Sequence, residues 1–155
     1  MKLRRERQLS ARAGTIRLPP RQLALGVPET YMNDSGLAVG ALLRRYAGGE
    51  LARLVVVHDE LDLEPGVVRV KSGGGTAGHN GLRSIESHLH SLDFVRVRIG
   101  IGKPPGRAEG AGHVLSRPSR RDREALEVAV ELAADAVELL LERGVEAAMN
   151  EVNAR

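Results

Sequence analysis

A run of apolar residues, Leu-Val-Val-Val at 54–57, constrains the fold more than any other part of this sequence. A short continuous apolar run rich in β-branched residues is typical of a strand buried on both faces of a parallel sheet. A second stretch, 93–102, instead alternates: Val95 and Val97 face one way, while Arg96 and Arg98 face the other. That alternation also predicts a strand. The chain is therefore expected to build a sheet from segments with helical patterns between them.

The helical patterns carry recognisable start and stop signals. Asp34 or Ser35 is expected to cap a first helix that Gly48 ends, and a second is expected over 80–89. Ser119 with Asp122 resembles a capping box that opens a long helix, which Gly144 stops. The stripe predicted for this helix contains Leu126, Val130, Ala133, Val137 and Leu140.

Strands interleaved with helices predict an α/β fold, a three-layer sandwich around a mixed, largely parallel central sheet. A length of 155 residues predicts a single domain over 1–155. Residues 21–27 alternate and predict a short strand, whereas 1–20 are expected to be an atypical arm. A loop is expected over 103–112, and one more strand is expected to begin after Pro65-Gly66.

The composition narrows the class of protein. Hydrophobic residues make up 42% of the chain and aromatic residues only 2%, so the core is expected to be aliphatic. No apolar run is long enough to span a membrane, the first residues do not form a secretory signal, and there is no cysteine for a disulfide. We therefore expect a cytoplasmic protein. The formal net charge of +3 rests mostly on arginine, which allows a polyanionic partner but also fits scattered surface charge.

The glycine loop at 73–78 is the first candidate site. Its spacing fits a dinucleotide-binding loop, but the acid expected about 20 residues later is absent, since that position is near Arg98. A phosphate-binding P-loop is excluded because His79-Asn80 stand where Lys-Ser/Thr belongs. A flexible turn remains an alternative, but three adjacent glycines favour the close approach of a ligand to the backbone.

The segment His-Asp-Glu-Leu-Asp at 58–62 is the second candidate. A divalent metal site is disfavoured because neighbours on a strand point to opposite faces, so His58 and Asp59 cannot face one ion. An acid that orients a general-base histidine is one alternative, and strand-end capping by Asp59 and Asp62 is another. In the loop before the first helix, Tyr31 offers an aromatic face and Asn33 an amide that both donates and accepts.

Taken together, these motifs closely resemble the bacterial-type peptidyl-tRNA hydrolases. The resemblance is carried by TYMNDSG at 30–36, the long block 55–85, DFVRVRIGIGKPPG at 93–106 and AMN at 148–150, and it runs from about residue 21 to 153. It implies an enzyme that cleaves the ester between a peptide and the tRNA 3′ end. It also implies an α/β sandwich that is monomeric and needs no metal or other cofactor.

The resemblance assigns a role to each matching residue. Tyr31 corresponds to an aromatic residue that lines the cleft. Asn33 and Asn80 correspond to the two asparagines that hold the junction of the terminal adenosine with the peptide, and the water. Asp59 corresponds to the acid that orients the catalytic histidine, and His79 neighbours that site.

Two cations complete the expected site. Lys71 and Arg98 correspond to the pair that clamps the 5′ phosphate of the tRNA. The expected partner is thus the acceptor stem and 3′ end of peptidyl-tRNA. Surface exposure of strand cations is the plain alternative for both residues.

One part of the family pattern has no counterpart in this sequence. The family begins with a strand, a G-x-G-N-P-G turn and a T-R-H-N segment that supplies the general base, whereas residues 1–20 contain no histidine and no such turn. We therefore expect a missing first strand, an exposed sheet edge and activity reduced about 10²–10⁴-fold. Substitution of the base by His58 or His79 is disfavoured. A non-catalytic RNA-binding relative and, less favoured, a nucleotide-binding protein remain as alternatives.

Overall fold

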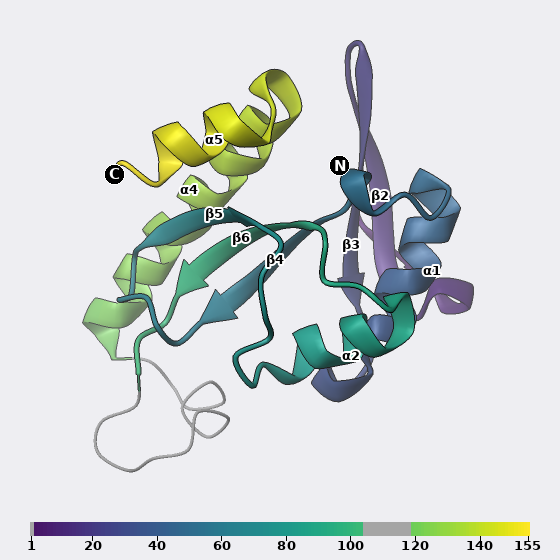
Figure 1. Cartoon of the computed structure of the whole chain (residues 1–155), viewed down its shortest axis with the longest axis horizontal. Coiled ribbons are helices and arrows are strands. Elements are labelled where there is room, and N and C mark those ends of the chain that lie inside the picture. The colour runs from purple at the N-terminus through teal and green to yellow at the C-terminus, as the bar shows by residue number, and fades with distance from the viewer. Residues whose placement is uncertain (1, 104–118) are drawn as a thin grey trace. The chain divides into compact units, whose positions relative to one another are not determined.

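The computed structural model describes residues 2–103 and 119–155 (Figure 1). Contacts between residues divide the chain into two compact units. Unit 1 comprises Met1–Leu54 and Gly73–Phe94, and unit 2 comprises Val55–Ser72 and Val95–Arg155. Apart from Lys103, the loop predicted over 103–112 lies outside the described residues.

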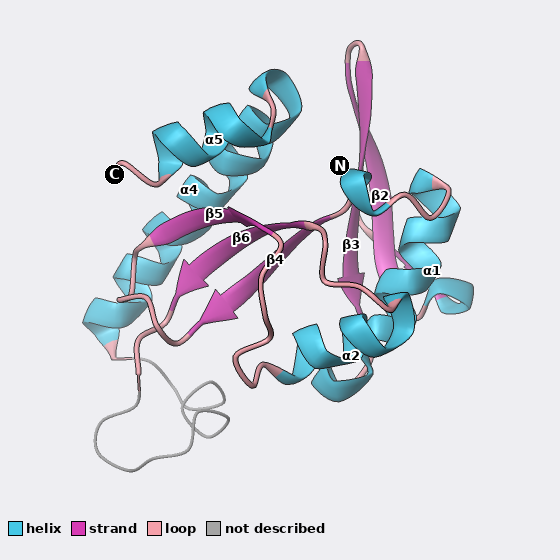
Figure 2. Cartoon of the chain, viewed as in Figure 1, coloured by secondary structure: helices cyan, strands magenta, loops and turns pink. Residues whose placement is uncertain are grey.

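Unit 1 contains an antiparallel sheet in the order β1-β2-β3 (Figure 2). Its strands are β1 (Arg4–Glu6), β2 (Ala11–Leu18) and β3 (Arg21–Pro28). The strand predicted over 21–27 is thus confirmed as β3, but the prediction of an arm over 1–20 missed two strands. Ala11 and Ala13 of β2 are buried against the first helix, and such small residues give a weak apolar signal in the sequence.

Two helices accompany this sheet within unit 1, namely α1 (Ser35–Ala47) and α2 (Asn80–Leu89). Short 3₁₀ turns, η1 (Arg7–Leu9), η2 (Met32–Asp34) and η3 (Leu51–Arg53), join the elements. As predicted, α1 ends at Gly48, whose φ of 60° is in the left-handed region. Asp34 is the N-cap of α1 but its side chain makes no capping bond, whereas the Ser35 hydroxyl donates to the Met32 carbonyl at 2.7 Å.

Unit 2 contains a sheet in the order β4-β6-β5. Its strands are β4 (Val55–Glu60), β5 (Val68–Ser72) and β6 (Val95–Gly100), with β4 parallel and β5 antiparallel to β6. The α/β class is therefore confirmed. The prediction of a largely parallel sheet is wrong for the described residues, because β4 with β6 is their one parallel pair.

The strand at 54–57 also differs from its prediction. It forms the start of β4, which lies at the edge of the unit 2 sheet, and 47% of Val57 is exposed. Apolar residues on both faces of a strand thus did not mean burial on both faces. A three-layer sandwich and a missing inner strand remain predictions.

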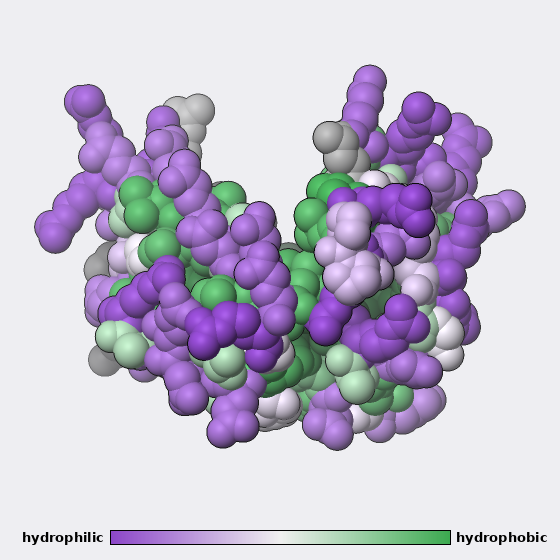
Figure 3. All heavy atoms as spheres, turned by 90° about the horizontal axis from the view of Figure 1, so that it is seen from above, coloured by the Kyte–Doolittle hydropathy of each residue, from purple (hydrophilic) through white to green (hydrophobic). Residues whose placement is uncertain are grey.

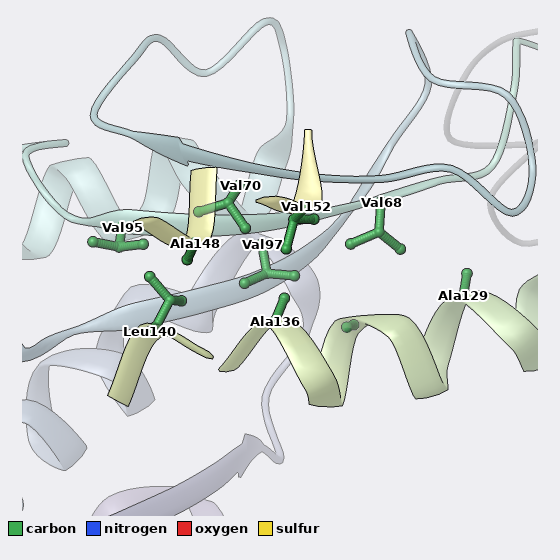
Figure 4. Close-up of a cluster of buried hydrophobic side chains, with 10 residues drawn as sticks. Val68, Val70, Val95, Val97, Ala129, Ala136, Leu140, Ala148 and Val152 are labelled. Atoms are coloured by element: carbon green, nitrogen blue, oxygen red, sulfur yellow. The ribbon is translucent and has the colours of Figure 1, made fainter. Parts of the chain in front are cut away.

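Two C-terminal helices, α4 (Arg120–Arg143) and α5 (Val145–Val152), cover one face of the unit 2 sheet. Figure 4 shows the core that they form with β5 and β6, which consists of valine from the strands and of alanine, leucine and Val152 from the helices. Ser119 caps α4 as predicted, since its hydroxyl accepts from the backbone N–H of Asp122 at 3.1 Å, and α4 ends before Gly144. In the predicted stripe Ala133 and Leu140 are buried, but 59% of Val130 is exposed.

The end of the chain closes the outer edge of β5. The Asn153 side chain accepts from the backbone N–H of Val70 at 2.8 Å and donates to the carbonyl of Val70 at 2.9 Å. An exposed strand edge is a template for unwanted pairing. The two bonds replace those of a neighbouring strand at this position.

Candidate functional site

Tyr31 and Asn33 lie where the chain leaves β3 and enters η2. Tyr31 precedes η2 with extended backbone angles, and 83% of the residue is exposed. Asn33 lies within η2 and is exposed as well. Both side chains are therefore accessible to a ligand, as a binding role requires.

The glycine loop leads directly into the N-terminus of α2. Gly73, Gly74 and Gly78 have φ values of 70°, 114° and 80°, which side chains rarely tolerate. Two backbone hydrogen bonds hold the loop. The N–H of Gly73 donates to the Phe94 carbonyl at 2.9 Å, and the N–H of His79 donates to the Thr76 carbonyl at 2.8 Å. Gly73, Gly74 and Gly78 thus fulfil a turn requirement in addition to any approach by a ligand.

Asn80 is the first residue of α2 and His79 is its N-cap. The Nδ1 atom of His79 accepts from the backbone N–H of Leu82 at 3.2 Å, which fixes the proton of the neutral ring on Nε2. His79 thus has a structural role that the sequence did not predict. Capping thus occupies Nδ1 of the ring.

The two asparagine-bearing segments touch each other in unit 1. A Cβ atom on Gly81 would lie 2.8 Å from Sδ of Met32 and 2.9 Å from Cε1 of His79, so a larger residue there would require one of these side chains to move. Asn33 follows Met32 and Asn80 precedes Gly81, so each asparagine is the chain neighbour of a residue at this contact. Met32 was not among the predicted site residues, since its partner lies 49 positions away in the sequence.

A buried hydrogen bond fixes α1 against α2 close to this contact. The backbone N–H of Gly36 donates to the Ser84 hydroxyl at 2.8 Å, and Ser84 is 6% exposed. A Cβ atom on Gly36 would lie 2.1 Å from the carbonyl oxygen of Ser84. That carbonyl also accepts from Nδ1 of His88 at 2.9 Å. These contacts hold the start of α1, and with it η2, against α2.

Asp59 lies in β4 of unit 2, where it is half-buried. The Nδ1 atom of the adjacent His58 donates to the backbone carbonyl of Asp59 at 2.7 Å. Asp62, predicted to cap the strand end, forms an ion pair with Lys103 at 3.3 Å. Within residues 2–103 and 119–155, no group of three or more candidate ligands could hold a metal ion.

Lys71 and Arg98 lie on one face of the unit 2 sheet. In the register of β5 and β6, Arg98 lies opposite Arg69 and Lys71 lies opposite Arg96. Lys71 and Arg98, the residues predicted to bind the 5′ phosphate, are therefore diagonal neighbours. Asp59 is paired with Ile99 on β6. Because side chains alternate along a strand, Asp59 faces the opposite side of this sheet.

Arg98 also has an acidic partner that the sequence did not suggest. Its Nη1 atom lies 3.4 Å from Oε1 of Glu60, with 24% of the Arg98 side chain exposed. Lys71 is exposed. The structure thus brings Tyr31, Asn33, His79 and Asn80 into unit 1, and Asp59, Lys71 and Arg98 into unit 2. A cleft shared by all seven residues remains a prediction.

Comparisons with known proteins add to this geometry. The chain matches the family Peptidyl-tRNA hydrolase over residues 1–155. The peptidyl-tRNA hydrolase of Rhodococcus erythropolis is 53% identical over 137 residues, which cover 88% of this chain and 72% of that protein. The peptidyl-tRNA hydrolase of Mycolicibacterium gilvum is 49% identical over 93% of this chain and 74% of its own length.

The crystal structure of peptidyl-tRNA hydrolase from Acinetobacter baumannii has a TM-score of 0.88 and 37% identity to this chain. The match covers 99% of this chain and 77% of the Acinetobacter baumannii chain. The family match includes the first twenty residues, so it does not support the prediction of an atypical arm or of a missing leading segment. Among the described helices, none is long and apolar enough to cross a membrane. From the match over the whole chain and the identity to these relatives, this protein belongs to the peptidyl-tRNA hydrolase family, which is a family of enzymes.

Proposed function

We propose that this protein hydrolyses the ester bond between the peptide and the tRNA 3′ end in peptidyl-tRNA, releasing free tRNA and peptide during translation. The observation that carries the proposal is the contact of Met32 with Gly81, which are the chain neighbours of Asn33 and Asn80. Family membership supplies the reaction class. The protein acts in this proposal as one domain over 1–155, as a cytoplasmic monomer without metal or other cofactor.

The two amides suit an ester at the end of an RNA. Each amide donates and accepts, so Asn33 and Asn80 can bind the ribose of the terminal adenosine, the ester carbonyl and the attacking water. Asn80 is the first residue of α2, where the helix dipole and unpaired N–H groups favour negative charge. The oxygen that becomes negatively charged when water adds to the ester carbonyl would be stabilised at that position. Tyr31 lines the entrance.

The acid and the cations of unit 2 have other roles in this proposal. Asp59 orients the histidine that removes a proton from the water, as the resemblance implies. Lys71 and Arg98 bind the 5′ phosphate of the tRNA, for which Arg98 exchanges its ion pair with Glu60 for a phosphate oxygen. Binding of that phosphate fixes the position of the acceptor stem on the protein.

The general base is the group without a counterpart in these 155 residues. No Arg-His-Asn segment occurs in the sequence, and Nδ1 of His79 is used as a helix cap.

The experiment measures initial rates of hydrolysis of an N-acetylated aminoacyl-tRNA by the 155-residue protein. Asn33→Asp and Asn80→Asp are expected to lower the rate at least tenfold, because each replaces an amide donor with a negative charge. Asn150→Asp, at an exposed position of α5, is the matched control and is expected to change nothing. Rates that Asn33→Asp and Asn80→Asp leave unchanged would remove the two amides from the mechanism.

The same assay tests whether His79 is the base. His79→Ala is expected to retain the rate of the parent protein, because Nδ1 of this ring caps α2. A rate that His79→Ala abolishes would assign the base to His79. Binding of tRNA without any hydrolysis above the uncatalysed rate would favour a non-catalytic RNA-binding relative.

A further inference from the structure

Four basic residues lie on one face of the unit 2 sheet. In the register of the two strands, Arg69 and Lys71 of β5 lie opposite Arg98 and Arg96 of β6. The valines between them face the core that α4 and α5 cover, so the four cations share the opposite face. Like charges that lie directly opposite each other are unfavourable. This face therefore favours a neighbouring anion.

Burial distinguishes part of this cluster from most charged residues of the protein. Hydrophilic side chains project into solvent from both units in Figure 3. Arg96, by contrast, is 3% exposed, and 24% of the Arg98 side chain is exposed. A cation that is shielded from water depends on an anionic partner more than a solvated cation does.

The four cations are not equally available to a ligand. Both Nη atoms of Arg69 donate to backbone carbonyls, at 2.7 and 3.0 Å, and Arg96 is buried. Lys71 is exposed. The buried Nε atom of Arg98 has no hydrogen-bond partner among the described residues, although its side chain reaches the surface. An anionic ligand of this face would thus meet Lys71 and Arg98.

Glu60 is the one acid among the residues of β4, β5 and β6 that share this face. It lies two positions after His58, which is opposite Arg98 in the parallel register of β4 and β6. Oε1 of Glu60 lies 3.4 Å from Nη1 of Arg98, and 17% of the Glu60 side chain is exposed. Oε2 accepts from the backbone N–H of Asp62 at 3.4 Å, and the Glu60 carbonyl accepts from the N–H of Ile101 at 3.0 Å. These contacts hold the carboxylate beside Arg98.

Glu60 and a phosphate therefore compete for the same guanidinium group. Arginine binds carboxylate and phosphate oxygens through the same N–H donors. A phosphate that binds Arg98 must replace the carboxylate of Glu60. The affinity of this face for phosphate is lower by the strength of the ion pair that is lost.

This competition affects product release. Hydrolysis at the 3′ end leaves the 5′ phosphate unchanged, so substrate and free tRNA carry the same group to this face. Binding energy that does not increase in the transition state does not accelerate the chemical step. Strong binding of the 5′ phosphate would instead retain the product.

We propose that Glu60 is an internal counterion that weakens binding of the 5′ phosphate by Lys71 and Arg98, so that the free tRNA dissociates after hydrolysis. This inference rests on the proposed function, in which these two cations bind that phosphate. Glu60 acts through Arg98 and has no contact with the ester. It determines affinity and is not a catalytic residue.

Deacylated tRNA with a 5′ phosphate, and the same tRNA with a 5′ hydroxyl, test this role. Dissociation constants are measured by fluorescence anisotropy at one salt concentration for the parent protein and Glu60→Gln, which removes the charge and keeps the size of the side chain. Glu64→Gln is the matched control, because it removes the same charge from an exposed position in the loop after β4.

Glu60→Gln is expected to bind the 5′-phosphorylated tRNA about fivefold more tightly, which corresponds to the upper end of the range for exposed ion pairs. Its affinity for the 5′-hydroxyl tRNA is expected to change as little as that of Glu64→Gln. Deacylated tRNA is expected to inhibit multiple-turnover hydrolysis more strongly by the same factor, whereas the single-turnover rate at saturating protein is expected to stay the same. In an Arg98→Gln background, Glu60→Gln is expected to have no effect.

Each other result has a definite meaning. Unchanged or weaker binding of the 5′-phosphorylated tRNA to Glu60→Gln, with the parent's preference for the 5′ phosphate intact, overturns the inference and leaves the proposed function standing. Equal tightening for both tRNAs, or the same gain in Glu64→Gln, would indicate a general effect of charge and also overturn it.

The parent protein separates the remaining outcomes. Hydrolysis of the ester without any preference for the 5′ phosphate would remove the phosphate site, and the role of Glu60 with it. A parent protein that neither binds tRNA nor hydrolyses the ester would fail the proposed function itself. If Glu60→Gln disturbs folding, as circular dichroism would show, Glu60→Asp carries the test, because its shorter side chain lengthens the ion pair and is expected to give a smaller gain in the same direction.

Discussion

Replacement of Ser84 by alanine is expected to weaken the junction of α1 with α2. The change removes the hydroxyl that accepts from the backbone N–H of Gly36 at 2.8 Å in a buried environment. Packing leaves little room for water, because the Gly36 Cα already lies so close to α2 that a Cβ atom would be 2.1 Å from the Ser84 carbonyl oxygen. The N–H of Gly36 would thus be left buried without an acceptor.

The expected cost follows from these contacts. A buried donor left without a partner costs about 1–3 kcal/mol. Alanine is a better helix former than serine by roughly 0.5 kcal/mol, which offsets part of this loss. The net decrease in the free energy of unfolding is therefore expected to be about 1–2 kcal/mol, or roughly 2–8 °C in melting temperature for a chain of this size.

Ser87→Ala is the matched control, since Ser87 is an exposed residue of the same helix and gains the same helix propensity. The difference between the two variants in denaturant unfolding isolates the buried hydrogen bond. Hydrogen exchange provides a local measurement, because the Gly36 amide is expected to lose protection in Ser84→Ala and keep it in Ser84→Thr, which retains the hydroxyl. Equal stability of the two alanine variants, with Gly36 still protected, would refute this reasoning.

Three further changes test other parts of the structure. Gly36→Ala is expected to destabilise the protein by more than Ser84→Ala, because the added methyl group meets the backbone of α2 rather than a mobile side chain. A neutral effect in thermal unfolding would show that α1 and α2 lie further apart. Asn153→Ala removes both bonds to Val70 and is expected to cost about 1–3 kcal/mol in denaturant unfolding. A neutral effect would contradict the edge-closing role. Ser119→Ala removes the α4 cap and is expected to lower the free energy of unfolding by about 1 kcal/mol, measured in the same way. Ser119→Asp is expected to keep most of that stability. Equal losses in the two variants would contradict capping.

Signals that span a few residues predicted their elements well. The alternation in 93–102 gave β6, Asn80 begins α2, and Ser119 and Gly144 bound α4. These features depend on the intrinsic geometry of a helix end or an extended strand, which neighbouring residues determine. The sheet-forming tendency of β2 was missed because alanine on its buried face differs little from alanine elsewhere. Its strand character depends on pairing with β1 and β3 and on the cover that α1 provides.

The types of site residue were predictable for the same reason, but their neighbours were not. An exposed tyrosine, two asparagines and a glycine loop can be identified in the sequence with the chemistry that they offer. The contact of Met32 with Gly81 and the ion pair of Arg98 with Glu60 join residues that are 49 and 38 positions apart. No local pattern encodes such a distance.

The sequence by itself therefore determined the α/β class, most helix boundaries, the family resemblance and the chemical character of the candidate residues. The tertiary structure decided that β5 runs antiparallel to β6, that β4 lies at an edge, and that His79 caps α2. The physical reason is that hydrogen bonds between strands and close helix packing connect segments through space. Their strength depends on the arrangement of both partners, which neither segment specifies alone.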